Sequence, residues 1–128
     1  MKLELLSGNY AICQVKKEEP YSEWISKDAF SSVTETDQEK SIVCLDDSIP
    51  DHITKEQGWR LMRVMGVLDF SLIGILSSIL EPLAEYKISV FAISTYNTDY
   101  IMVKEETLNK AAEALKKKGH HIIGEELF

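Results

Sequence analysis

The sequence is short of the residues that would place it in several classes of protein. Two cysteines among 128 residues are too few for a disulfide scaffold and, without nearby ligands, for a zinc site. The longest apolar stretch, residues 70–80, is interrupted by glycine and serine and is shorter than a membrane span, which needs about 20 residues. The N-terminal segment has no apolar run long enough for a signal peptide. We therefore expect a cytoplasmic protein without a membrane partner.

Positive charge is scarce as well. The chain has 14 lysines and arginines against 21 aspartates and glutamates, which gives a net charge of −7. Binding to nucleic acid through counterion release needs clustered basic residues in excess, so the composition argues against a nucleic-acid partner. The densest basic run, residues 116–118, is typical of a solvated helix end. With 45% hydrophobic and 27% charged residues, the chain has the balance of a folded protein.

Motifs of enzyme active sites are missing. The sequence has no GxSxG, P-loop, GxGxxG or HExxH pattern. Cys13 and Cys44 both lie within apolar segments, which predicts buried thiols in a reducing compartment rather than a nucleophile. His120 and His121 are adjacent, and neighbouring side chains of a strand point to opposite faces, so we expect no metal site there. The sequence predicts no catalytic residue, no metal and no cofactor.

The second half of the chain does have a regular alternation of strands and helices. Residues 59–67 alternate with apolar side chains on both sides, which indicates a central strand. Apolar residues at i, i+3, i+4 and i+7 predict a helix after it, capped by Asp69 or Ser71 and bent near Pro82. The remaining elements are expected to be strands at 88–95 and 98–103, a helix at 107–118 and a strand at 120–123. This is the βαββαβ order of a ferredoxin-like domain.

The first half predicts shorter elements in a similar order. Two short strands are expected on either side of a turn within residues 1–15. A segment at 21–27 could form two helical turns that begin after a proline. Residues 30–34 and 41–45 are typical of a second pair of strands.

A faint internal repeat connects the two halves. The segment FSSVT at 30–34 parallels FAIST at 91–95, 61 positions later, and each is followed by an apolar return strand, SIVC or YIMV. The sequence thus predicts an α+β fold of two tandem ferredoxin-like modules, residues 1–58 and 59–128, of which the first is degenerate.

The loops at one end of the second module could form a ligand site. In a βαββαβ module the segment 66–71 after the first strand lies close to the segment 94–100 at the end of the second. A helix N-terminus offers backbone N–H groups to a carboxylate, and Asp99 with nearby carbonyl oxygens could receive an ammonium group. One anion site beside one cation site matches a zwitterionic amino acid. The alternative interpretation is that these residues only cap the helix and turn the chain.

The run LDFSLIGILSSILEPLAEYKISVFAISTYNTDYIMVKEETLNKAAEALKKKGH resembles the second module of small tandem ACT-domain proteins. That family is related to the regulatory domains of aspartate kinases and to animal cytosolic arginine sensors. Its most specific pieces here are FSLxGIL at 70–76 and ISTYxTDYxxVK at 93–104, and the resemblance extends back to the N-terminal LELL.

The resemblance also implies which residues would contact a ligand. They form a loop before the helix and a facing strand end: Asp69, Leu72, Gly74 and Ile75, and Thr95, Tyr96 and Asp99. Gly74 would allow close approach because it has no Cβ, Tyr96 would form a wall, and Asp99 would meet a cationic group. At Leu72 the sequence departs from the arginine sensors, which have an acidic residue there.

The resemblance implies a non-catalytic regulatory protein that binds a free amino acid at an interface between ACT units. It also implies a homodimer and a regulated enzyme or signalling partner. One alternative is an ACT-like protein–protein interaction module with a vestigial ligand pocket. Another is a small enzyme of ferredoxin-like fold, for which the sequence offers few candidate residues.

Overall fold

The computed structural model describes residues 1–66, 73–124 and 128. The chain divides into two compact units, each described by itself below. The N-terminal unit is Gly8–Trp59, and the C-terminal unit combines Met1–Ser7 with Arg60–Phe128. The division after Trp59 lies one residue from the boundary expected from the sequence, but the first seven residues belong to the C-terminal unit.

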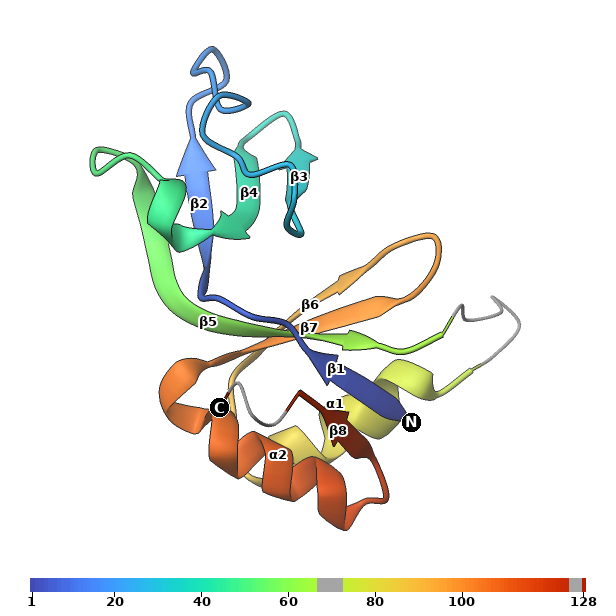
Figure 1. The fold of residues 1–128 in the computed structure, drawn as a ribbon. Helices are drawn as coiled ribbons and strands as arrows, with labels where there is room; N and C mark the ends of the chain where they lie inside the picture. Colours follow the sequence, from blue (N-terminus) through green and yellow to red (C-terminus); the bar gives the residue numbers. More distant parts are fainter. Residues whose placement is uncertain (67–72, 125–127) are drawn as a thin grey trace. The chain divides into compact units, whose positions relative to one another are not determined.

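The C-terminal unit is a mixed α+β structure in which two helices cover one face of a sheet (Figure 1). Its strand order is β6-β7-β5-β1-β8. In chain order, β5-α1-β6-β7-α2-β8 follows the predicted βαββαβ pattern. The strands are β1 (Lys2–Leu5), β5 (Thr54–Val64, of which Arg60 onward belongs to this unit), β6 (Val90–Ser94), β7 (Asp99–Lys104) and β8 (His121–Ile123). The helices are α1 (Ile75–Glu85), the short 3₁₀ turn η2 (Glu105–Thr107) and α2 (Leu108–Lys117).

Strand β1 lies between β5 and β8. It pairs antiparallel with β5, where Leu3 is opposite Val64, and parallel with β8, where Leu3 is opposite Ile122. Leu3 and Leu5 are almost completely buried in the core of this unit. The sequence predicts two strands on either side of a turn within residues 1–15, which are β1 and β2. The structure does not pair them with each other: β1 pairs with β5 and β8, where its leucines are buried beneath the helices of the C-terminal unit, and β2 pairs with β4 and β5.

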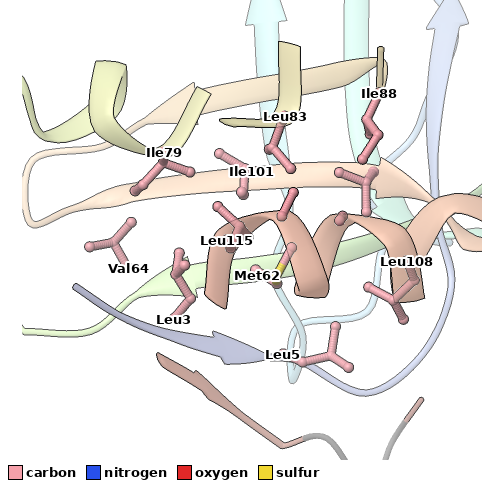
Figure 2. Close-up of a cluster of buried hydrophobic side chains, with 13 residues drawn as sticks. Leu3, Leu5, Met62, Val64, Ile79, Leu83, Ile88, Ile101, Leu108 and Leu115 are labelled. Carbon is pink, nitrogen blue, oxygen red and sulfur yellow. The ribbon is translucent and has the colours of Figure 1, made fainter. Parts of the chain in front are cut away.

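The core of the C-terminal unit lies between the sheet and its two helices, as Figure 2 shows. Strands β5 and β7 contribute Met62, Val64 and Ile101, and α1 contributes Ile79 and Leu83. Leu76 and Leu80 pack against this core while half-buried. The apolar stripe predicted for α1 is therefore confirmed for the part of the helix that the structure describes.

Helix α1 begins later than predicted. Its N-cap is Gly74, which has a left-handed backbone with φ of 76°, whereas the predicted caps Asp69 and Ser71 lie outside the described residues. Pro82 lies within the last turns and lacks the N–H that would bond the carbonyl of Ser78. His120 Nε2 lies 3.0 Å from that carbonyl oxygen and donates to it in place of the missing N–H.

The N-terminal unit is a sheet without an α-helix in its described residues, which are all of Gly8–Trp59. Its strands follow the order β3-β4-β2-β5, and all neighbours are antiparallel. Besides the first part of β5, they are β2 (Tyr10–Val15), β3 (Ser32–Glu35) and β4 (Lys40–Leu45), the last followed by the 3₁₀ turn η1 (Asp46–Ser48). The helical segment expected at 21–27 is wrong: these residues form turns, and their apolar side chains, Tyr21, Trp24 and Ile25, pack against the core.

Each unit contains a hairpin followed by a 3₁₀ turn, and the two sets of elements lie at a constant spacing in the sequence. Strands β3 and β6 end at Glu35 and Ser94, β4 and β7 begin at Lys40 and Asp99, and η1 and η2 begin 59 residues apart as well. SIVC and YIMV align at this spacing. The FSSVT and FAIST alignment, with a spacing of 61, is wrong by two residues.

Candidate ligand site

The turn between β6 and β7 is closed by backbone and side-chain hydrogen bonds. Thr95 N and Thr95 Oγ1 both donate to the carbonyl of Thr98, at 2.8 and 2.9 Å, and Thr98 N donates back to Thr95 Oγ1 at 3.3 Å. Tyr96, at the tip of the turn, is 81% exposed. The turn therefore holds its backbone in one conformation while presenting an aromatic ring to the outside.

A buried hydrogen bond fixes this turn to the end of β5. Thr98 Oγ1 donates to the carbonyl of Val64 at 2.8 Å, and Thr98 is only 6% exposed. The sequence predicts this proximity between the end of the module's first strand, here β5, and the turn that follows its second strand, here the β6–β7 turn. Asp69 and Leu72, which the predicted site also includes, lie outside the described residues.

Asp99 is the acidic group of the candidate site. Its carboxylate is half-buried and accepts a hydrogen bond from Ser94 Oγ at 2.6 Å. Within the described part of the chain, no lysine or arginine pairs with Asp99. One serine hydroxyl uses only part of the acceptor capacity of a carboxylate, so Asp99 can still bind a cationic group.

Gly74 and Ile75 form the start of α1. A Cβ added to Gly74 would meet nothing within 4 Å, so the glycine is required by its positive φ rather than by a close neighbour. The first turn of α1 leaves backbone N–H groups available to an anion. Figure 1 shows this helix start at the same end of the C-terminal unit as the β6–β7 turn. No hydrogen bond among the described residues joins Gly74 or Ile75 to that turn.

The sequence interpretation missed Thr98 and Ser94, which hold the turn and Asp99 in place. A signal was available, because the β3–β4 turn has the same pattern. Thr36 N and Oγ1 donate to the carbonyl of Glu39, and Glu39 N donates to Thr36 Oγ1. A threonine at the first position of both turns, 59 residues apart, could have revealed it.

The two thiols are placed as predicted, deep in the core of the N-terminal unit. Cys13 and Cys44 are 2% and 1% exposed. The hydrogen bond between them and their burial raise the pKa of the Cys44 thiol, whereas the same hydrogen bond lowers the pKa of Cys13. Without exposure, neither thiol can act as a nucleophile on a substrate.

The described residues offer little for other chemistry. They contain no group of three or more histidine, cysteine, aspartate or glutamate side chains that could hold a metal ion. His120 is buried and His121 is exposed, as expected for neighbours that point to opposite faces. No helix in the described part of the chain is long and apolar enough to cross a membrane.

Comparison with known protein families identifies the class to which this fold belongs. The sequence model of the ACT domain matches residues 54–117, which is half of the chain. A second family model, for an N-terminal domain, matches residues 8–52 and falls within the N-terminal unit. The chain belongs to the ACT-domain family.

Curated relatives share part of this sequence. The cytosolic arginine sensor for mTORC1 subunit 1 of Homo sapiens is 38% identical over 61 residues, which are 47% of this chain and 18% of the sensor. The Bos taurus protein of the same name matches equally well. The matched segment thus spans less than a fifth of the length of these relatives.

Solved structures extend the similarity to the whole fold. A protein from Agrobacterium tumefaciens is 35% identical, with a TM-score of 0.88 over 95% of this chain and 91% of that chain. The regulatory subunit of aspartate kinase from Thermus thermophilus is 10% identical, with a TM-score of 0.61 over 91% of this chain and 96% of that subunit. At that identity, the second likeness concerns the fold alone.

Proposed function

We propose that the chain is a non-catalytic regulatory protein that binds a free amino acid through its C-terminal unit, which includes most of the ACT-domain match and is called the ACT unit below. The ligand would contact the β6–β7 turn, with Thr95, Tyr96 and Asp99, and the start of α1 at Gly74 and Ile75. Asp69 and Leu72, in the segment before α1, are proposed to complete the site. A second copy of the chain in a homodimer is proposed to supply the facing ACT unit.

The observation that carries this proposal is the state of Asp99. A half-buried carboxylate that has one hydroxyl donor and no cationic partner among the described residues is suited to an ammonium group. The helix start at the same end of the unit is suited to a carboxylate. The arginine-sensor name of the curated relatives supports an amino acid as the ligand.

We also propose that the N-terminal unit is a degenerate ferredoxin-like module, in tandem with the ACT unit. Its order β3-β4-β2-β5 corresponds to β6-β7-β5-β8 once β1 is set aside. The shared hairpin with its constant spacing of 59 residues supports a common origin. Turns replace both helices, which accounts for the faint repeat in the sequence.

Regulation would follow from a difference in affinity. A ligand that binds one arrangement of the dimer more tightly than another shifts the population toward it. At 100 times its dissociation constant, a ligand stabilises the state that binds it by about 2.7 kcal/mol. A regulated enzyme or signalling partner could respond to a shift of that size.

The first test is a thermal-shift screen of the purified chain against the twenty amino acids at millimolar concentration. We expect one or two of them to raise the melting temperature by several degrees, about what a gain of 1–3 kcal/mol gives for a chain of this size. A flat response from a folded protein would contradict amino-acid binding.

The residue-level test is the substitution Asp99→Asn. The amide keeps the size of the side chain and can still bond Ser94, but it removes the charge that would attract an ammonium group. We expect affinity for the amino acid found in the screen to fall about tenfold or more, with an unchanged melting temperature without ligand. Asp37→Asn, an exposed aspartate in the β3–β4 turn, is the matched control and should keep full affinity. Normal affinity in Asp99→Asn would overturn the assignment of the site.

A second candidate function is a protein–protein interaction module with a vestigial pocket. The observation that favours it is strand β6, which has the sequence VFAIS without a charge and pairs with β7 alone among the described strands. An uncharged edge strand is a ready template for pairing with another chain. A flat thermal-shift screen together with a stable dimer in sedimentation would favour this function over the first.

A further inference from the structure

The N-terminal unit contains a cavity of about 420 Å³ that the proposed amino-acid site does not use. The described residues that line it all belong to this unit. They come from the carboxyl end of β2, the β3–β4 turn and the segment that leads into β5, which Figure 1 shows at one end of the unit.

The position of this cavity corresponds to that of the candidate site in the C-terminal unit. Strand β2 has the place of β5, and the β3–β4 turn has the place of the β6–β7 turn and shares the hydrogen bonds that close it. The residue that begins the strand after the turn is Lys40 in one unit and Asp99 in the other. The last residue of the preceding strand is Glu35 or Ser94. The two sites are therefore alike in framework and opposite in the charge at the equivalent position.

Lys40 is a buried cation whose positive charge is only partly balanced by neighbouring groups. Its side chain is 10% exposed, and its ammonium donates to the carbonyl of Lys17 at 3.0 Å and lies 5.1 Å from the centre of the Tyr21 ring. Among the described residues, the only carboxylate paired with it is that of Glu35, at 3.6 Å and 62% exposed, so water weakens this ion pair. An ammonium has three N–H donors, and because Glu35 is largely exposed, the Lys40 ammonium can also donate to a further anion.

The other walls of the cavity also favour a singly charged anion. Among the residues that the structure describes, three lysines and two glutamates line it, a net charge of +1 in a chain whose overall charge is −7. One of the glutamates, Glu19, is already paired with His52 at 3.4 Å. The amides of Gln14 and Gln38 and the hydroxyl of Thr54 add neutral hydrogen-bonding groups. A phosphate dianion fits the cavity less well. No arginine among the described residues lines the cavity to bind it, and it would have to lie near two glutamates.

We propose that this cavity is a second ligand site, which binds a small organic monocarboxylate with Lys40 as its anchoring cation. It differs in place and in chemistry from the amino-acid site, because it requires no ammonium group on the ligand. The chain would then respond to two kinds of small molecule through two related hairpins.

The test is a titration of the full ¹⁵N-labelled chain, followed by amide chemical shifts at constant ionic strength. The probes are N-acetylglycine and pyruvate, which are carboxylates without an ammonium group, together with inorganic phosphate and methylammonium. We expect saturable shifts from the two carboxylates, confined to residues 14–17, 38–40 and 52–54. Phosphate or methylammonium binding as tightly as the carboxylates would overturn the assignment, and so would the absence of saturation or shifts confined to 94–99.

Two variants test the anchoring role. Lys40→Met keeps the apolar stem of the side chain and should weaken N-acetylglycine about tenfold. Lys17→Met, at an exposed residue that lines the cavity, should weaken it by about threefold and is informative even if Lys40→Met fails to fold. Lys110→Met on the exposed face of α2 is the control and should bind normally.

Unchanged affinity in both cavity variants would overturn the proposal. Amino-acid binding is read separately, from the shifts of residues 94–99 when the amino acid found in the thermal-shift screen is added. A failure of the carboxylate site and a failure of the amino-acid site are therefore distinguishable in the same labelled sample.

Discussion

The hydroxyl of Thr98 is a single group that joins two parts of the C-terminal unit. The hydroxyl donates to the carbonyl of Val64 in a buried position. The backbone carbonyl of Thr98 accepts from Thr95 and so closes the β6–β7 turn. A buried carbonyl that loses its hydrogen-bond donor destabilises the folded state, because it is removed from water without gaining another partner. The proposed amino-acid site thus depends on a residue that would not itself touch the ligand.

We predict that Thr98→Val destabilises the chain by about 1–3 kcal/mol, since valine has the shape of threonine but no donor for Val64. Urea unfolding of the two proteins measures the difference. The matched control is Thr34→Val, at an exposed position of β3, where we expect a change within about 0.5 kcal/mol. Equal unfolding midpoints for Thr98→Val and the original chain would show that the hydrogen bond contributes nothing.

Helix α1 shows how one element is completed by a side chain from elsewhere in the sequence. Pro82 removes the helical donor for Ser78, and His120, just before β8, supplies another from its ring. Because a carbonyl can only accept, Nε2 of His120 must carry the proton. The proline is thereby tolerated inside the helix.

This arrangement predicts a specific non-additivity. His120→Leu should cost about 1–3 kcal/mol, because the Ser78 carbonyl loses its donor. In the Pro82→Ala background the cost should be smaller, because the N–H of the new alanine can bond Ser78. Urea unfolding of the four proteins of this cycle measures the coupling, with exposed His121→Leu as the control. The same cost in both backgrounds would contradict the role given to His120.

Elements with strong local patterns could be predicted from the sequence, and the others could not. The period of α2 and the turn with Thr95, Tyr96 and Asp99 were visible because they depend on neighbours in the chain. The late start of α1 depends on the left-handed backbone of Gly74, and the turns at 21–27 on packing against a distant core. The burial of the Lys40 ammonium could not be predicted from the sequence, because it arises only when the sheet forms.

At the scale of the whole molecule, the ACT-family match at 54–117 does not coincide with the C-terminal unit, which also includes residues 1–7 and continues beyond residue 117. Strand β1 comes from the other end of the chain and fills the place between β5 and β8. Its two leucines belong to the core of the C-terminal unit. Without β1, the sheet would lose a central strand and β8 its neighbour.

We therefore predict that a chain without residues 1–7 has no stable C-terminal unit. Loss of each buried leucine alone is worth about 2–5 kcal/mol, and the whole stability of a domain is about 5–15 kcal/mol. The measurement is the loss of dispersed amide signals for residues 60–124, and their return when a synthetic peptide of residues 1–7 is added. Preserved signals in the shortened chain would contradict a structural role for β1.

The place of β1 also sets an order of events during synthesis on the ribosome. β1 leaves the exit tunnel before either of its neighbours, and the N-terminal unit is made between it and the part of β5 with which it pairs, residues 62–64. β1 must remain unpaired until β5 emerges, and its second edge is not covered until β8, near residue 123, has been translated. Pairings so distant along the chain are slow to form, so the ACT unit can complete its fold only when nearly all of it has been made.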